Sequence, residues 1–170
     1  MKLTSAAAVK MIRLFNADIN KLKTVEQERS NFTASTDEKL EDVRPEYDFP
    51  EIQSQLEALE KKVRVLKHAV NLFNTGTVLP EFGMTIDEAL VYMPQLNARV
   101  QKYDAMRTAQ PKERARAYMV GNGRLTEYKY ANYRITDAAE AYEKSSLELT
   151  RLQTALDLAN NTLEFEVEGL

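Results

Sequence analysis

The chain holds one histidine, His68, so any imidazole chemistry depends on that residue. An imidazole can act as a general base beside a serine and an aspartate, or it can bind a metal ion. A helical Glu-x-x-His metal motif requires a glutamate at position 65, where this chain has Val65. His68 also falls at an outer position relative to the apolar stripe around it. We therefore interpret His68 as a surface or interface residue rather than a base or a ligand.

Carboxylates are frequent, and several of them facing inward would form a metal site made of oxygen ligands alone. Most of them fall off the apolar stripes of the helices predicted below, which is typical of solvated helix faces. The sequence predicts no catalytic, cofactor-binding or metal-binding residue, and a carboxylate-based metal-dependent enzyme stays an alternative. The carboxylates considered are Glu57, Glu60, Asp87, Glu88, Asp104, Glu140, Glu143, Glu148 and Asp157.

Tyrosines alternate with basic residues near a Gly121-Asn122-Gly123 turn. Aromatic and basic side chains on strands can stack on bases and contact phosphates of single-stranded nucleic acid. The net charge of the chain is −3 and no RNA-recognition signature is present, so we expect structural packing here and no nucleic-acid partner. Together with His68, the possible interaction surface comprises Arg124, Tyr128, Tyr130 and Tyr133.

A modest basic stretch surrounds Pro111 and would suit an acidic partner. The acidic tail of another subunit, with Glu164, Glu166 and Glu168, is one such partner. The basic residues are Arg99, Lys102, Arg107, Lys112, Arg114 and Arg116.

Long helices must position these side chains, and the cleanest helical pattern is a stripe at 3-4 spacing over 49–73. A second apolar row, Ala58, Val65 and Leu72, follows at intervals of seven residues, so we expect this helix to contact two neighbours, within the chain or across subunits. The stripe consists of Phe49, Ile52, Leu56, Leu59, Val63, Leu66, Val70 and Phe73.

Other helices are predicted at about 4–29, from the Thr85/Glu88 capping box onward, and from Asp137 to about 163. The segment 31–46 is polar and predicts a flexible loop. Aromatic-rich runs flanking the glycine turn predict a β-hairpin at about 114–135. The tail 163–168 alternates with period two and is compatible with a short edge strand. The fold class is therefore mainly α, an antiparallel four-helix bundle or long helical hairpins with one small β-hairpin.

Composition places the chain among soluble single-domain proteins, with one helical domain over 1–170. Hydrophobic residues make up 44% and charged residues 29%, and there is no cysteine, which excludes disulfides and thiolate chemistry. No signal peptide or membrane-spanning run is visible. We expect a cytoplasmic protein with no membrane partner.

Four segments resemble a bacterial family of small helical proteins of unknown function, some of which are labelled septicolysin-like. These segments are 67–75 (KHAVNLFNT), 84–90 (MTIDEAL), 130–133 (YANY) and 155–157 (ALD), and the similarity covers about 48–166. The matching motifs are mostly packing and capping residues, and the resemblance implies no catalytic residue. The label hints at a cytolysin, so a membrane-active protein is a further alternative.

The function predicted from sequence is that of a helical interaction or structural protein that forms a homo-oligomer and has no recognisable catalytic site. The long apolar stripes, the second apolar row and a hairpin that needs a docking partner support this prediction. Single-stranded nucleic-acid binding by the hairpin stays an alternative. The sequence identifies no small-molecule ligand.

Overall fold

In the computed structural model, backbone is described for residues 1–120 and 123–170 and side chains for 1–117 and 126–170. The chain divides into two compact units, unit 1 with Met1–Thr77 and Leu158–Leu170, and unit 2 with Val78–Asp157. Each unit is described by itself. That the whole chain is a single domain stays a prediction.

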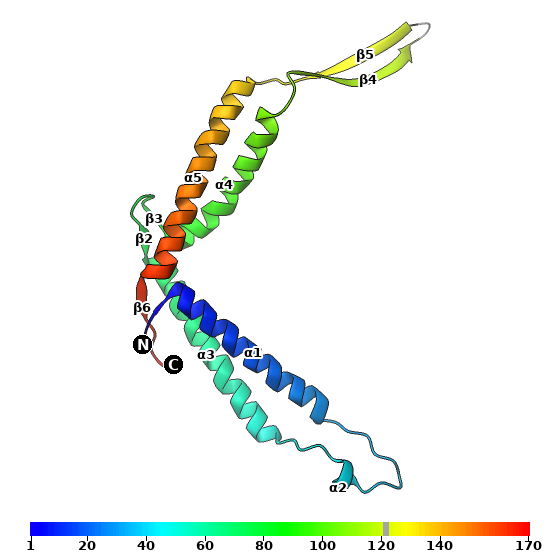
Figure 1. Cartoon of the computed structure of the whole chain (residues 1–170), viewed down its shortest axis with the longest axis vertical. Helices are drawn as coiled ribbons and strands as arrows, with labels where there is room; N and C mark the ends of the chain where they lie inside the picture. The colour runs from blue at the N-terminus through cyan, green and yellow to red at the C-terminus, as the bar shows by residue number, and fades with distance from the viewer. Residues whose placement is uncertain (121–122) are drawn as a thin grey trace. The chain divides into compact units, whose positions relative to one another are not determined.

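Side-chain caps determine where the two long helices of unit 1 begin. The Thr4 hydroxyl accepts a hydrogen bond from the Ala7 N–H at 3.2 Å, and α1 runs over Ser5–Arg29. The Asp48 carboxylate accepts from the Glu51 N–H at 3.1 Å, and α3 runs over Phe49–Gly76 with Pro50 in its first turn. The two helices lie antiparallel and side by side (Figure 1).

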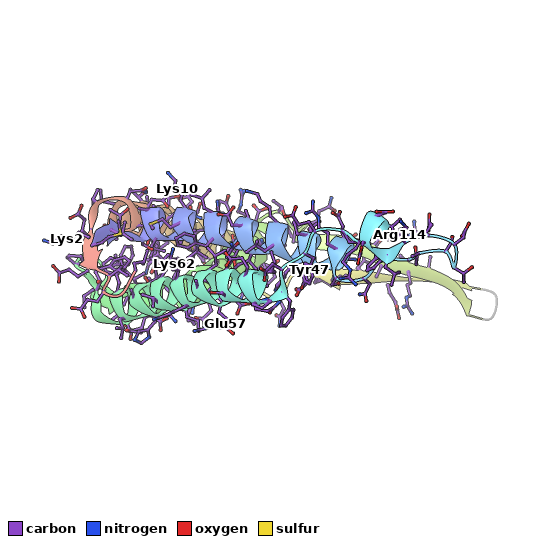
Figure 2. All side chains as sticks on the ribbon, turned by 90° about the horizontal axis from the view of Figure 1, so that it is seen from below. Lys2, Lys10, Tyr47, Glu57, Lys62 and Arg114 are labelled. Atoms are coloured by element: carbon purple, nitrogen blue, oxygen red, sulfur yellow. The ribbon has the colours of Figure 1, made fainter. Side chains whose placement is uncertain are left out.

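Two apolar clusters form the core of unit 1. Ile19 of α1 packs with Leu56 and Val63 of α3 in one cluster. Ala8 and Leu66 are fully buried in the other, together with Val167. In Figure 2, Lys10 and Glu57 point away from the partner helix, as expected for the polar faces of amphipathic helices.

The middle of the predicted stripe on α3 is buried, whereas its first residue is not. Leu56, Val63 and Leu66 are buried, but Phe49 is 59% exposed. A strict heptad stripe drifts by about 20° per heptad on a straight helix, so its end turns away from the partner helix. In the second row Val65 is half-buried, whereas Ala58 is exposed and Leu72 is 59% exposed. A second neighbour for this row across subunits stays a prediction.

The C-terminal tail forms the predicted short strand, β6 (Glu164–Glu166). Its partner is a strand that was not predicted, β1 (Lys2–Thr4), which pairs antiparallel with Leu3 opposite Phe165. The Met1 amino group donates to the Val167 carbonyl at 3.0 Å, and the Val167 N–H donates back to Met1 at 2.8 Å. The two chain ends are thereby held together (Figure 1).

The segment predicted as the loop 31–46 contains one short helix, α2 (Leu40–Val43). Beyond it, the Tyr47 hydroxyl donates to Glu26 at 3.1 Å, and the Gln53 amide donates to the same carboxylate oxygen at 2.6 Å. Burial and the Glu26 carboxylate raise the pKa of Tyr47. These bonds connect α1 to the segment that enters α3.

Unit 2 begins with two short antiparallel strands that were not predicted, β2 (Val78–Leu79) and β3 (Met84–Thr85). Gly83, with φ of 64°, allows the turn between them. The helix α4 (Ile86–Arg107) starts at the predicted capping box and continues through Pro94. The helix α5 (Ile135–Thr162) lies beside it, and the boundary between the units falls within α5 (Figure 1).

The predicted β-hairpin is present as β4 (Lys112–Val120) and β5 (Gly123–Tyr130). The strands pair antiparallel, and the register shifts by one residue between Arg114 and Arg116, at a β-bulge. The predicted turn at Gly121-Asn122-Gly123 includes residues 121 and 122, which lie outside the described part. The mainly α fold class with long helical hairpins and one small β-hairpin is confirmed.

Candidate functional site

One face of the β4–β5 hairpin combines aromatic and cationic side chains. The register places Lys112 opposite Tyr130 and Arg114 opposite Tyr128, so these four side chains share a face. The Lys112 ammonium lies 4.1 Å from the centroid of the Tyr128 ring and 5.5 Å from that of Tyr130. The two rings are 6.5 Å apart and tilted by 52°. We call this set of four residues the cation–tyrosine face.

The opposite face of the hairpin carries charges of both signs. Glu113 lies opposite Lys129, and Arg116 lies opposite Glu127. Glu113 and Arg116 are three residues apart, so they would lie on opposite faces of a regular strand. The bulge between Arg114 and Arg116 places both pairs on one face. This face is balanced in charge, whereas the cation–tyrosine face carries only positive charge and can attract an anionic or π-rich group.

The described hairpin side chains are almost entirely in solvent. Every residue of 111–117 and 127–130 is exposed, with Tyr128 at 45% and Tyr130 at 62%. A two-stranded ribbon with no apolar face against a core is marginally stable in water. In the part of the chain that the structure describes, β4 and β5 pair only with each other.

The base of the hairpin is attached to the end of α4. The Tyr133 hydroxyl donates to the Met106 carbonyl at 2.9 Å, which satisfies one of the free carbonyls at that helix end. The Ala131 N–H donates to the Pro111 carbonyl at 3.1 Å, closing the two strands at their base. A small cavity of about 330 Å³ lies here, lined in part by Met106, Tyr130 and Tyr133.

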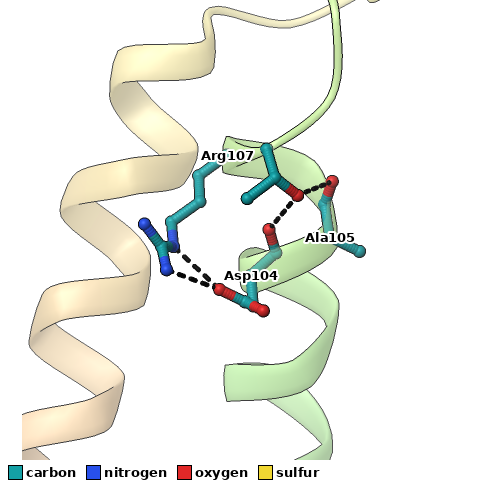
Figure 3. Close-up of polar contacts among 4 residues, drawn as sticks. Asp104, Ala105 and Arg107 are labelled. Carbon is teal, nitrogen blue, oxygen red and sulfur yellow. Dashed lines mark hydrogen bonds and ion pairs between the residues drawn. The ribbon is translucent and has the colours of Figure 1, made fainter.

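The last turn of α4 is held by polar contacts shown in Figure 3. Arg107 pairs with Asp104 at 2.7 Å, and the Thr108 hydroxyl donates to the Asp104 carbonyl at 2.8 Å. The Arg107 guanidinium also lies 4.0 Å from the centroid of the Tyr142 ring of α5. These contacts fix the helix end from which the hairpin starts.

His68 lies in unit 1, where it lines a groove between α3 and the C-terminal tail. The groove has a volume of about 550 Å³. Its apolar wall comes from Leu72, Phe73 and Phe165, and the rings of Phe73 and Phe165 stack with centroids 4.8 Å apart. Glu166 and Glu168 also line it. We call this the α3–tail groove.

The structure therefore brings together some of the predicted surface residues and separates others. Tyr128 and Tyr130 share one face with basic side chains, whereas Tyr133 lies at the hairpin base and His68 lies in the other unit. The side chain of Arg124 lies outside the described residues. The groove around His68 could not be inferred from its helical position, because the return of the tail beside α3 creates it.

The predicted basic stretch is divided among several contacts. Arg107 is paired with Asp104, whereas Arg99 and Lys102 lie over the rings of Tyr92 and Tyr103. Only Lys112, Arg114 and Arg116 belong to the hairpin.

Within the described residues, no group of three or more His, Asp or Glu side chains is arranged to hold a metal ion. No described helix is long and apolar enough to cross a bilayer.

No protein-family model matches the chain, and no curated protein matches it. A solved structure with a similar fold is the crystal structure of a functionally unknown conserved protein from Corynebacterium diphtheriae. The TM-score is 0.59 and the identity 16%, covering 98% of this chain and 100% of the other. At this identity the likeness shows the fold alone. It indicates no catalytic function.

Proposed function

We propose that this chain is a helical interaction protein that self-associates, with the β4–β5 hairpin as its binding element. The observation that carries the proposal is the exposure of the hairpin, whose described strand residues are exposed except for the half-buried Thr126. A ribbon of this kind gains stability when its aromatic face is buried against a partner. The partner favoured is a second copy of this chain, as a soluble cytoplasmic homo-oligomer.

Charge distribution supports a second copy as the partner. The segment 112–130 carries five basic and two acidic residues, a net charge of +3. The whole chain carries −3, which leaves −6 on the remainder. A basic arm on an acidic protein favours attraction between copies over long distances.

The test is to replace 113–129 by a short Gly-Ser linker. We expect the variant to keep its helical circular dichroism signal, because the side-chain caps of α1, α3 and α4 all lie outside 113–129. We also expect light scattering to show a monomer where the natural chain is an oligomer. A natural chain that is monomeric up to high micromolar concentration would contradict the proposal, and so would a variant that still associates.

A second candidate is binding of single-stranded nucleic acid, favoured by the cation–tyrosine face alone. Exposed tyrosines beside Lys112 and Arg114 provide stacking and phosphate contacts. Labelled single-stranded RNA should then show an anisotropy increase that falls with salt and is lost in the Tyr128→Ala/Tyr130→Ala variant. An unchanged signal at low salt would eliminate this candidate.

We propose a family relationship to the septicolysin-like proteins but no cytolytic activity. A cytolysin would release dye from liposomes, and we expect no release. A carboxylate-based enzyme is disfavoured because the described carboxylates do not converge.

A further inference from the structure

Both the cation–tyrosine face and the α3–tail groove leave apolar side chains uncovered. In the groove, Leu72 is 59% exposed although it borders the stacked rings of Phe73 and Phe165. On the hairpin, Tyr128 and Tyr130 are exposed on a ribbon without a core. Each surface would therefore be stabilised by a partner that removes apolar area from water.

The two surfaces are complementary in chemistry. The hairpin face presents two tyrosine rings and the positive charges of Lys112 and Arg114. The groove presents an apolar wall, with the carboxylates Glu166 and Glu168 on its tail side. Aromatic rings would bury against the wall, and the cations would approach the carboxylates at the rim, which is the usual arrangement of an interface core and its rim.

The dimensions agree with this pairing. A volume of about 550 Å³ lies within the range of concave sites that bind small ligands. The two ring centroids are 6.5 Å apart, so the rings form one compact aromatic pair. Tyrosine provides large contact area at a low cost in side-chain entropy, because it has few rotatable bonds.

We propose that the cation–tyrosine face of one copy docks into the α3–tail groove of a second copy. The inference rests on the proposed self-association and adds to it the surface that receives the hairpin. Because the two surfaces are different patches of the same chain, the contact is made twice in a symmetric dimer or propagates along a ring or chain.

The test reverses the charges on each side of the proposed contact. In one variant, Lys112→Glu and Arg114→Glu make the hairpin face acidic. In the other, Glu166→Lys and Glu168→Lys make the groove rim basic. We expect each variant alone to associate at least about tenfold more weakly, because each faces like charge in the contact. An equimolar mixture should associate again, because every hairpin–groove pair between unlike copies then has opposite charges.

Matched controls carry charge changes of the same size outside both surfaces, at exposed residues of unit 1. Lys10→Glu with Arg13→Glu changes exposed residues of α1, and Glu57→Lys with Glu60→Lys changes exposed residues of α3. We expect the control variants to associate like the natural chain. Helical circular dichroism establishes that all variants are folded.

The outcomes separate the two proposals. If the natural chain does not associate, the proposed function fails and this inference fails with it. If it associates but the groove variant associates equally well, or the mixture of variants stays monomeric, only the assignment of the groove is overturned. Analytical ultracentrifugation of each variant and of the mixture provides the readout.

Discussion

At the scale of single residues, the hydrogen bond between Tyr92 and Glu148 is the clearest side-chain link between α4 and α5. The Tyr92 hydroxyl donates to the Glu148 carboxylate at 2.8 Å in a half-buried position. We predict that Tyr92→Phe lowers the free energy of unfolding by about 1 kcal/mol, the usual net worth of such a bond. Urea denaturation measures it. Tyr103→Phe, the same change about three turns further along α4, serves as the control.

The Tyr92 bond also predicts a pH dependence. The hydrogen bond to Glu148, followed by burial, raises the pKa of Tyr92 above its usual value near 10. A raised pKa in the folded state means that the stabilisation is complete below the unfolded pKa and is lost as the pH rises through the folded pKa. The difference in unfolding free energy between the natural chain and Tyr92→Phe should therefore shrink only under alkaline conditions. A difference that already shrinks at neutral pH would contradict this assignment.

At the scale of secondary-structure elements, the capping box of α4 shows how a local sequence signal fixes a helix start. The Glu88 N–H donates to the Thr85 hydroxyl at 3.2 Å, and the Thr85 N–H donates to the Glu88 carboxylate at 2.7 Å. We predict that Thr85→Ala costs about 1 kcal/mol in unfolding free energy. Thr150→Ala is the matched control, because the Thr150 hydroxyl only bonds back to the Ser146 carbonyl within α5. A loss in the control as large as that in Thr85→Ala would refute the capping explanation.

The same cap makes α4 sensitive to acid. Hydrogen bonds from the Thr85 backbone and hydroxyl lower the pKa of Glu88. A carboxyl group with a lowered folded pKa stabilises the fold above its unfolded pKa, and that contribution is lost as the pH falls through the folded pKa. Glu88→Gln, which removes the titrating carboxylate, should therefore flatten the acid side of the stability profile, and chemical denaturation at several acidic pH values would measure the change.

Elements with local signals were predictable, and elements made by distant pairing were not. The capping box of Thr85 and Glu88 identified the start of α4 from neighbouring residues alone. The pairing of β1 with β6 joins residues at opposite ends of the chain, and no local pattern in Lys2–Thr4 predicts a strand. The short strands β2 and β3 were missed because two residues per strand give no visible alternation.

In the candidate site too, features with a local sequence signal were predictable, and features that depend on distant contacts were not. Alternating tyrosines predicted the hairpin, but the bulge between Arg114 and Arg116 decides which basic residues share a face with them. The helical pattern placed His68 away from the apolar stripe, and it is indeed exposed. The groove beside it depends on Phe165 stacking on Phe73, a contact that forms only when the tail returns to α3.

At the scale of the whole molecule, the charge difference between the hairpin and the remainder predicts how self-association responds to salt. With +3 on 112–130 and −6 elsewhere, attraction between copies is screened as the Debye length falls from about 10 Å at 0.1 M to about 3 Å at 1 M salt. Two rim pairs worth about 0.2–1 kcal/mol each predict that the dissociation constant of one hairpin–groove contact rises about two- to thirtyfold over this range of sodium chloride.

Sedimentation equilibrium at several salt concentrations measures this change. The control variant Lys10→Glu/Arg13→Glu should keep a dissociation constant that rises with salt, because its hairpin and groove keep their opposite charges. The variant Lys112→Glu/Arg114→Glu should reverse this trend, because salt then screens repulsion between like charges in the contact. Association through the exposed apolar row of α3 would be strengthened by sulfate, a salt that is excluded from the protein surface. If the dissociation constant of the natural chain does not rise with sodium chloride but falls with added sulfate, self-association would be assigned to Ala58 and Leu72 instead of the hairpin.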